Sequence, residues 1–200
     1  MPSSSASLPP VELHPLEPFL PANGRLLMLG SFPPQQKRWC MDFFYPNFTN
    51  DMWRIFGLIF FGEPLHFVDT ERKTYRMAEI VDFLSTKGVG IYDTACAVRR
   101  LQDNASDKFL EVVTPTDIEA LLARMPLCRA IVTTGQKATD TICAHFGIEQ
   151  PKMGASTAFL LGDEEFRLYR MPSSSRAYPM ALAKKAEAYR RMFEEIFEEG

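Results

Sequence analysis

"LLMLGSFPPQQKRWCMDFFYPNFTNDMW", residues 26–53, is the stretch from which the organisation of the chain can be worked out. Its first four residues form an apolar run of strand length, which ends in Gly30 and Ser31 and is followed by two prolines. Aromatic residues and asparagines then crowd together where an ordinary loop carries Gly, Ser, Lys and Glu. A strand followed directly by such a loop raises the question of what the loop holds.

Similar apolar runs recur at residues 88–92, 129–133 and 157–161, with a further candidate strand at 166–170. Amphipathic helical patterns lie between most of these runs, at residues 50–61, 75–84 and 114–125, after Gly135, and from Pro179 onward. Continuous apolar strands that alternate with helices predict a parallel sheet that is covered on both faces. We therefore expect an α/β protein with three α/β/α layers around a central, mostly parallel four-stranded sheet.

The length and composition of the chain indicate a single domain. The chain has 200 residues, 46% of them apolar, which is enough for one sizeable core, and nothing in its middle resembles a linker. Residues 1–24 are rich in proline and contain a serine cluster, so we expect an extended, peripheral N-terminal arm in front of one domain at 25–200. No apolar run approaches the roughly 20 residues that cross a bilayer, so we expect a cytoplasmic monomer without a membrane partner.

The cysteines and histidines give no sign of a metal or redox site. The four cysteines are widely spaced without a CxxC pair, and the three histidines are scattered. We therefore expect buried reduced thiols, no metal and no cofactor. The net charge of -3 gives no general attraction to nucleic acid, which argues against a nonspecific DNA coat but leaves open a site with local positive charge.

The segments that follow the expected strands are candidates for a binding site. Ligands of open parallel sheets bind beyond the carboxyl ends of the strands. This rule brings four segments to one rim, namely "GSFPP", "YDTACAVRR", "TTGQKA" and "MPSSSRAY".

Three of these segments resemble, in the same order, the motifs of the uracil-DNA glycosylase superfamily. "LGSFPP" is similar to that superfamily's GQDPYH or GINPG, "IYDTA" to its base-reading strand, and "MPSSS" to its late HPSPLS or NPSGLS loop. "PNFTNDMW" further resembles the HPxNxFW of the mismatch-specific branch, and "YDT" with "PSSS" resembles the hypoxanthine-type branch. The likeness extends over residues 25–193, and it implies a glycosylase-like fold and the removal of damaged bases from DNA.

The resemblance implies a pocket for one flipped base. A glycosylase swings a nucleotide out of the stack into a pocket, where aromatic faces and polar groups replace its former partners. The base-binding candidates are Gly30, Phe32, Phe43, Phe44, Tyr45 and Asp93. Asp93 stands where the superfamily has its base-recognising side chain: an ionised carboxylate accepts an N–H of the base, and a protonated one in a dry pocket can also donate. Ordinary packing of the aromatic residues and capping by Asp93 remain open as alternatives.

The catalytic candidates are Ser31, Asn47 and Asn50. The main chain near Ser31 can approach the departing base, and the hydroxyl adds a donor. Phe32 stands where the best-known branches have the Asp or Asn that positions water, and Met171 stands where they have the His or Asn that steadies the departing base. Because neither apolar side chain does that work, another polar residue must hold the water, with Asn47 or Asn50 as first choice. Asn50 is at least as well suited to cap the following helix.

The DNA-contact candidates lie after the third and the last strand. Ser173, Ser174, Ser175 and Arg176 can bind phosphates around the flipped nucleotide, and Gln136 with Lys137 offers a second contact at a helix start. A plain polar turn and ordinary helix initiation are the alternatives.

These residues lead to a functional hypothesis. The enzyme hydrolyses the N-glycosidic bond of a deaminated or damaged base, of the uracil or hypoxanthine type, in base excision repair, and its partner is DNA with a damaged or mismatched base. No lysine at a motif position supports a covalent imine, so monofunctional hydrolysis is favoured. Two alternatives remain, a catalytically inactive DNA-binding relative and an unrelated nucleotide-binding α/β domain.

Overall fold

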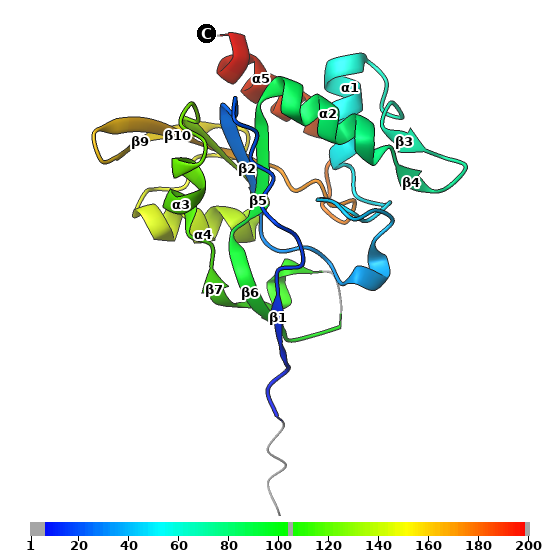
Figure 1. Ribbon diagram of the computed structural model, residues 1–200, viewed down its shortest axis with the longest axis horizontal. Coiled ribbons are helices and arrows are strands. Elements are labelled where there is room, and N and C mark those ends of the chain that lie inside the picture. The colour runs from blue at the N-terminus through cyan, green and yellow to red at the C-terminus, as the bar shows by residue number, and fades with distance from the viewer. Residues whose placement is uncertain (1–6, 104–105, 199–200) are drawn as a thin grey trace, which may run out of the picture.

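The computed structural model describes residues 7–103 and 106–198, and a five-stranded sheet forms its centre (Figure 1). The strands lie in the order β5 (Val89–Asp93), β2 (Leu26–Gly30), β8 (Ala130–Thr134), β10 (Glu164–Met171) and β9 (Ser156–Leu161). The first four are parallel, and β9 pairs antiparallel with β10. The expected number of four strands is therefore wrong by one. Only Gly162 and Asp163 separate β9 from β10, and such a short turn joins antiparallel strands.

Helices cover both faces of this sheet. α1 (Met52–Phe61), α2 (Met77–Lys87) and α5 (Leu182–Glu198) lie on one side, and α3 (Ile118–Ala123) and α4 (Gln136–Phe146) lie on the other (Figure 1). Every residue of β2, β5 and β8 is buried, as strands covered on both faces require. The expected three-layer α/β/α architecture is confirmed.

A second, three-stranded sheet was not anticipated by the apolar pattern. It pairs β1 (Val11–Leu13), β6 (Ala95–Arg100) and β7 (Leu110–Pro115) in antiparallel fashion. Thr114 and Pro115, expected to begin a helix, belong to β7 instead. α3 starts later because Asp117 caps it, with its carboxylate accepting a hydrogen bond from the Ala120 N–H at 2.9 Å.

The N-terminal arm is extended but is packed onto the domain. Its strand β1 lies along β6, the His14 N–H donates to the Cys96 carbonyl at 2.8 Å, and Phe19 forms a bridge with Ile91 of the central sheet. Residues 11–19 of the arm therefore pack as part of the domain. Residues 1–6 of the expected arm lie outside the described residues.

Short elements complete the structure: β3 (Val68–Asp69), β4 (Thr74–Tyr75) and the 3-10 turns η1 (Gln36–Arg38) and η2 (Asp107–Phe109). All four cysteines are free thiols, and burial raises the pKa of the Cys128 thiol to about 12. Within residues 7–103 and 106–198, no helix combines the length and apolar character needed to span a bilayer.

Candidate active-site cavity

The loops after four parallel strands converge on one cavity of about 310 Å³. This volume is at the lower end of the roughly 300–1,000 Å³ that small-molecule sites enclose. Its lining comes from the segments 30–34, 44–47 and 173–177, together with Arg38, Thr49, Asn50, Asp93, Arg100, Asp107 and Thr134. The convergence expected from the strand order is therefore present, and the cavity can hold a group the size of a nucleobase.

Gly30 and Asp93 face each other in the lining of the cavity. They are register partners at the ends of β2 and β5, and Asp93 is buried. A Cβ atom added to Gly30 would lie 2.5 Å from Asp93 Oδ1, far closer than non-bonded atoms approach. Only glycine therefore leaves room for the Asp93 carboxylate in this position.

His14, from the N-terminal arm, holds the other carboxylate oxygen. Its Nε2 lies 2.8 Å from Asp93 Oδ2, and both side chains are almost fully buried. The ring is enclosed by three aromatic rings, with centroid distances of 5.2 Å to Phe32, 6.2 Å to Phe44 and 4.5 Å to Tyr92. The sequence offers no signal for this contact, because a single histidine in a proline-rich arm has no recognisable pattern.

The expected aromatic wall is only partly present. Phe44 and Tyr45 line the cavity, and Phe32 lines it while packing into a small apolar cluster of β6 and β7. Phe43 does not line the cavity, because it packs against Phe19, Phe44 and Trp53 in the core, which corrects the expectation for this residue.

Tyr45 joins the cavity wall to β8. Its hydroxyl lies 2.9 Å from Thr134 Oγ1, and burial raises the pKa of this hydroxyl. Its backbone has a φ of 51°, an uncommon value for a residue with a side chain. The hydrogen bond and the packing against Trp53 hold the ring in this strained turn.

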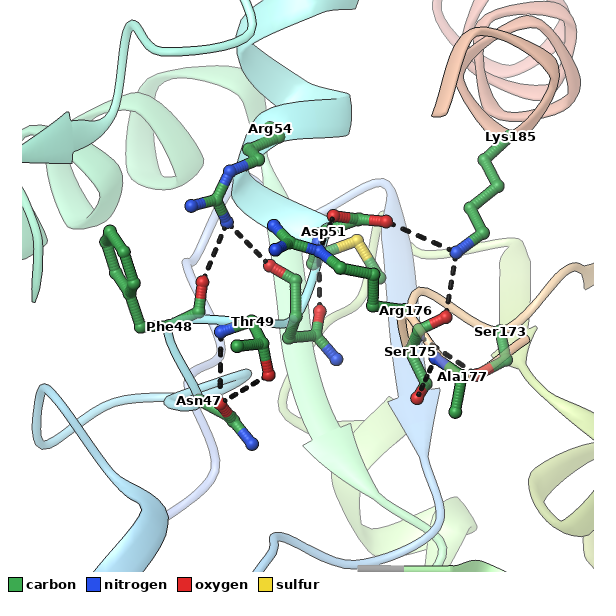
Figure 2. A network of polar contacts seen from close by, with 12 residues as sticks. Asn47, Phe48, Thr49, Asp51, Arg54, Ser173, Ser175, Arg176, Ala177 and Lys185 are labelled. Carbon is green, nitrogen blue, oxygen red and sulfur yellow. Dashed lines mark hydrogen bonds and ion pairs between the residues drawn. The ribbon is translucent and has the colours of Figure 1, made fainter. Parts of the chain in front are cut away.

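Asn47 and Asn50 both line the cavity, but each uses its side-chain oxygen locally. Asn47 Oδ1 accepts hydrogen bonds from the Thr49 N–H at 3.0 Å and the Thr49 hydroxyl at 2.8 Å (Figure 2). Asn50 Oδ1 accepts from the Met52 N–H at 2.9 Å, which makes it a cap of α1. The capping alternative therefore applies to Asn50.

The backbone of this asparagine loop is held from behind. The Tyr75 hydroxyl donates to the Asn50 carbonyl at 2.7 Å, and Arg54 Nη1 donates to the carbonyls of Phe48 and Asn50 at 2.9 and 3.1 Å. Burial raises the pKa of the Tyr75 hydroxyl to about 12, so it stays a hydrogen-bond donor at neutral pH. The loop is thus fixed to the domain while its asparagines face the cavity.

The loop after β10 is joined to the start of α1 by Asp51. Arg176 Nε lies 3.2 Å from Asp51 Oδ1, and Lys185 Nζ lies 3.3 Å from Asp51 Oδ2 (Figure 2). The Asp51 N–H also donates to the Ser174 carbonyl at 2.9 Å, and Lys185 Nζ donates to the Ser175 carbonyl at 2.8 Å. Lys185 is completely buried, whereas the Arg176 side chain is half exposed.

The serine side chains shape this loop. Ser173 Oγ accepts from the Ser175 N–H at 3.2 Å, and Ser175 Oγ accepts from the Ala177 N–H at 3.3 Å (Figure 2). Ser174 is buried. All three serines and Arg176 line the cavity. The serines therefore form a polar turn and also lie at the candidate site.

Gln136 and Lys137 begin α4, as expected, but neither lines the cavity. The Gln136 amide is used by Asp140 and Gln150, to which Nε2 donates at 2.7 and 3.0 Å, and Lys137 Nζ donates to the Leu110 carbonyl at 3.0 Å. Both side chains therefore lie outside the cavity lining, and a phosphate contact by them stays a prediction.

Three charged residues that line the cavity, Arg38, Arg100 and Asp107, were missed. Asp107 lines the cavity, and burial raises the pKa of its carboxyl, whereas the Ser31 hydroxyl acts in the opposite direction. Arg100 is buried and contacts both carboxylate oxygens of Glu12 at 3.2 and 3.1 Å. Asp107 lies in a polar loop without periodicity, so no sequence signal points to it. Glu12 and Arg100 carry no pairing signal either.

The cavity offers no site for a metal ion in its described part. Among residues 7–103 and 106–198, no group of three or more His, Cys, Asp or Glu side chains is arranged to hold one. Of the two carboxylates that line the cavity, Asp93 is instead hydrogen-bonded to His14.

Comparison with known proteins identifies the fold. No family model matches the chain, and no curated protein matches it. Among solved structures, the chain is similar to the solution structure of a protein from Methanosarcina acetivorans described as a "putative Uracil DNA glycosylase". The TM-score is 0.54 at 24% sequence identity, and the match covers 88% of this chain and 97% of the other. The two proteins share their fold.

Proposed function

We propose that this protein is a DNA glycosylase that hydrolyses the N-glycosidic bond of a deaminated base. One observation carries the proposal: a buried carboxylate, Asp93, faces a base-sized cavity across Gly30 at the carboxyl ends of the parallel strands. The fold likeness to a protein described as a uracil DNA glycosylase supports the same interpretation of the cavity.

Asp93 supplies the selection of the base. When it is ionised, its carboxylate only accepts hydrogen bonds, so it then favours a base that presents an N–H. Deamination converts the ring nitrogen at the pairing edge of cytosine or adenine from an acceptor into an N–H donor. Uracil and hypoxanthine therefore suit Asp93, while the parent bases present a lone pair to it. Phe44 and Tyr45 provide the aromatic surface that replaces stacking in the helix.

Phe32 is apolar and cannot position the water that attacks the sugar, so another, polar residue must do so. Asp107 meets this need best, because it is the second carboxylate that lines the cavity. A carboxylate in this position orients the water and stabilises the positive charge that develops on the sugar. Asn47 and Asn50 are weaker candidates for this role, because the side-chain oxygen of each already accepts local hydrogen bonds.

Two further features fit hydrolysis on DNA. No lysine lines the described part of the cavity, so water rather than an amine is the nucleophile. Arg38 and Arg176 lie at the cavity, and both are exposed enough to contact phosphates.

A single-turnover assay tests the proposal. Protein in excess is incubated with oligonucleotides that contain uracil, hypoxanthine or xanthine, and abasic products are cleaved with alkali. We expect strand scission for at least one deaminated base and none for undamaged DNA. Selective binding of these oligonucleotides without product would instead indicate an inactive DNA-binding relative, in keeping with the apolar Phe32 and Met171.

A further inference from the structure

The N-terminal arm contributes two side chains to the surroundings of the cavity. Successive residues of a strand point to opposite faces, so Glu12 and His14 share one face of the arm while Leu13 points away. Leu13 is 76% exposed, and the His14 ring is almost completely buried. Glu12 and His14 each contact a charged residue that lines the cavity, Arg100 and Asp93 respectively.

We propose that His14 is a positioning residue of the base-reading site, which holds the Asp93 carboxylate as a hydrogen-bond acceptor aimed at the base. This inference rests on the proposed function. Glu12 anchors the same strand through its two contacts with Arg100, so the arm is part of the site rather than an appendage.

The hydrogen bonds of His14 determine its tautomer. The Leu16 N–H lies 3.1 Å from His14 Nδ1, and a backbone N–H can only donate, so Nδ1 must carry a lone pair. The ring proton therefore resides on Nε2, which donates to Asp93 Oδ2 at 2.8 Å. Such a partner on the second nitrogen fixes both ring orientation and tautomer.

This arrangement leaves Asp93 Oδ1 as the oxygen over Gly30. With Oδ2 engaged by His14, the carboxylate has one defined rotamer, and its remaining oxygen faces the base. Loss of the His14 donor allows the carboxylate to turn, and small misplacements of a reacting or reading group reduce rates strongly. A purely structural role of His14 predicts a loss of stability and no specific effect on excision.

Three variants separate these roles. His14→Leu removes the donor but keeps an apolar side chain among the surrounding rings, His14→Gln restores an N–H donor, and Leu13→Ser changes the exposed face of the same strand. Single-turnover excision of uracil and hypoxanthine, affinity for the same DNA and urea unfolding are measured for each.

We expect His14→Leu to lower the excision rate on the order of 10²-fold with little change in DNA affinity. His14→Gln recovers most of that loss, and Leu13→Ser matches the wild type. Wild-type rates in folded His14→Leu would overturn the inference, as would a loss that merely follows its stability.

Long-range proton–nitrogen NMR of the free protein provides a readout that does not depend on activity. We expect His14 to be protonated on Nε2 and unprotonated on Nδ1. A proton on Nδ1 overturns the inference. If the wild type excises no base, the proposed function fails, and the tautomer alone then decides whether His14 positions Asp93.

Discussion

Lys185 Nζ lies 3.3 Å from Asp51 Oδ2, although 134 residues separate the two in the chain. The pair joins α5 to the start of α1, and Lys185 is completely buried. Both residues also bind the loop after β10, through the carbonyls of Ser174 and Ser175. One buried ion pair therefore fixes two walls of the cavity to each other.

Lys185→Met is expected to destabilise the protein by about 3 kcal/mol, the lower end of the cost of leaving a buried charge without its partner. The lower end applies because Arg176 still contacts Asp51. Urea unfolding measures the change. The control is Arg176→Met, whose side chain is 52% exposed, so it should cost less than about 1 kcal/mol. An equal decrease in the free energy of unfolding in the two variants would contradict the claim that the buried Lys185 stabilises the protein more than the exposed Arg176 does.

Asp93→Asn is expected to reduce excision of uracil and hypoxanthine by about 10²-fold or more, a loss typical of removing one preorganised polar group. An amide presents donor hydrogens as well as an oxygen, so it loses the selection for an N–H on the base. Single-turnover rates test this. Asp163→Asn, in the exposed turn between β9 and β10, is the matched control and should leave the rate unchanged. An unaffected rate in Asp93→Asn would remove this residue from the reaction.

Gly30→Ala tests the placement of Asp93 without removing its carboxylate. The new Cβ would lie 2.5 Å from Asp93 Oδ1, so the carboxylate must move, and we expect an excision rate about 10- to 100-fold lower. The double variant Gly30→Ala/Asp93→Ala completes a mutant cycle, in which the Gly30→Ala change should cost nothing further once the carboxylate is absent. Additive losses would show that Gly30 acts independently of Asp93.

Asn50→Ala is expected to lower the free energy of unfolding by about 1 kcal/mol, because it removes the cap of α1. Asn50→Asp keeps a capping oxygen and should restore stability and excision together. Stability is measured by urea unfolding and excision in single turnover. If Asn50→Asp is stable but inactive, the carboxamide takes part in the chemistry and capping is not its only role.

The central sheet and the position of the site are predictable because buried parallel strands leave continuous apolar runs in the sequence. Once these strands are located, the rule that ligands bind at their carboxyl ends places Gly30, Asp93 and Ser174 together. The run at 157–161 predicts β9 as a strand but not its antiparallel pairing with β10, and the sheet formed by β1, β6 and β7 lacks this signal. Polar and charged residues interrupt β6 and β7, so their pairing depends on tertiary contacts.

The details of the cavity are less predictable for a similar reason. The sequence predicts that α4 starts at Gln136, yet the direction of that side chain depends on Asp140, Gln150 and Arg170. His14 contacts Asp93 from the N-terminal arm, and Asp107 lines the cavity from η2, and neither periodicity nor spacing indicates these contacts. Such contacts become visible only when the tertiary structure is known.

Asp107→Asn is expected to make the protein more stable at neutral pH. Burial raises the pKa of the Asp107 carboxyl above its ordinary value of 3.8, although Ser31, Lys137 and Arg100 act in the opposite direction. Between the unfolded and folded pKa values the native state binds more protons than the unfolded chain, so wild-type stability falls as pH rises through this window. Asparagine has no such proton to lose.

The stability difference between Asp107→Asn and the wild type should therefore grow with increasing pH and become constant above the window. Urea unfolding at several values between about pH 4 and 8 measures it, with the exposed Asp82→Asn as a control that shows no such trend. If the Asp107 carboxylate orients the attacking water, wild-type excision rises with pH through the same window, while Asp107→Asn is slower by about 10²-fold and lacks this rise. A more stable variant with wild-type activity would show that Asp107 has no part in the reaction. Asn47 would then be the candidate for positioning the attacking water.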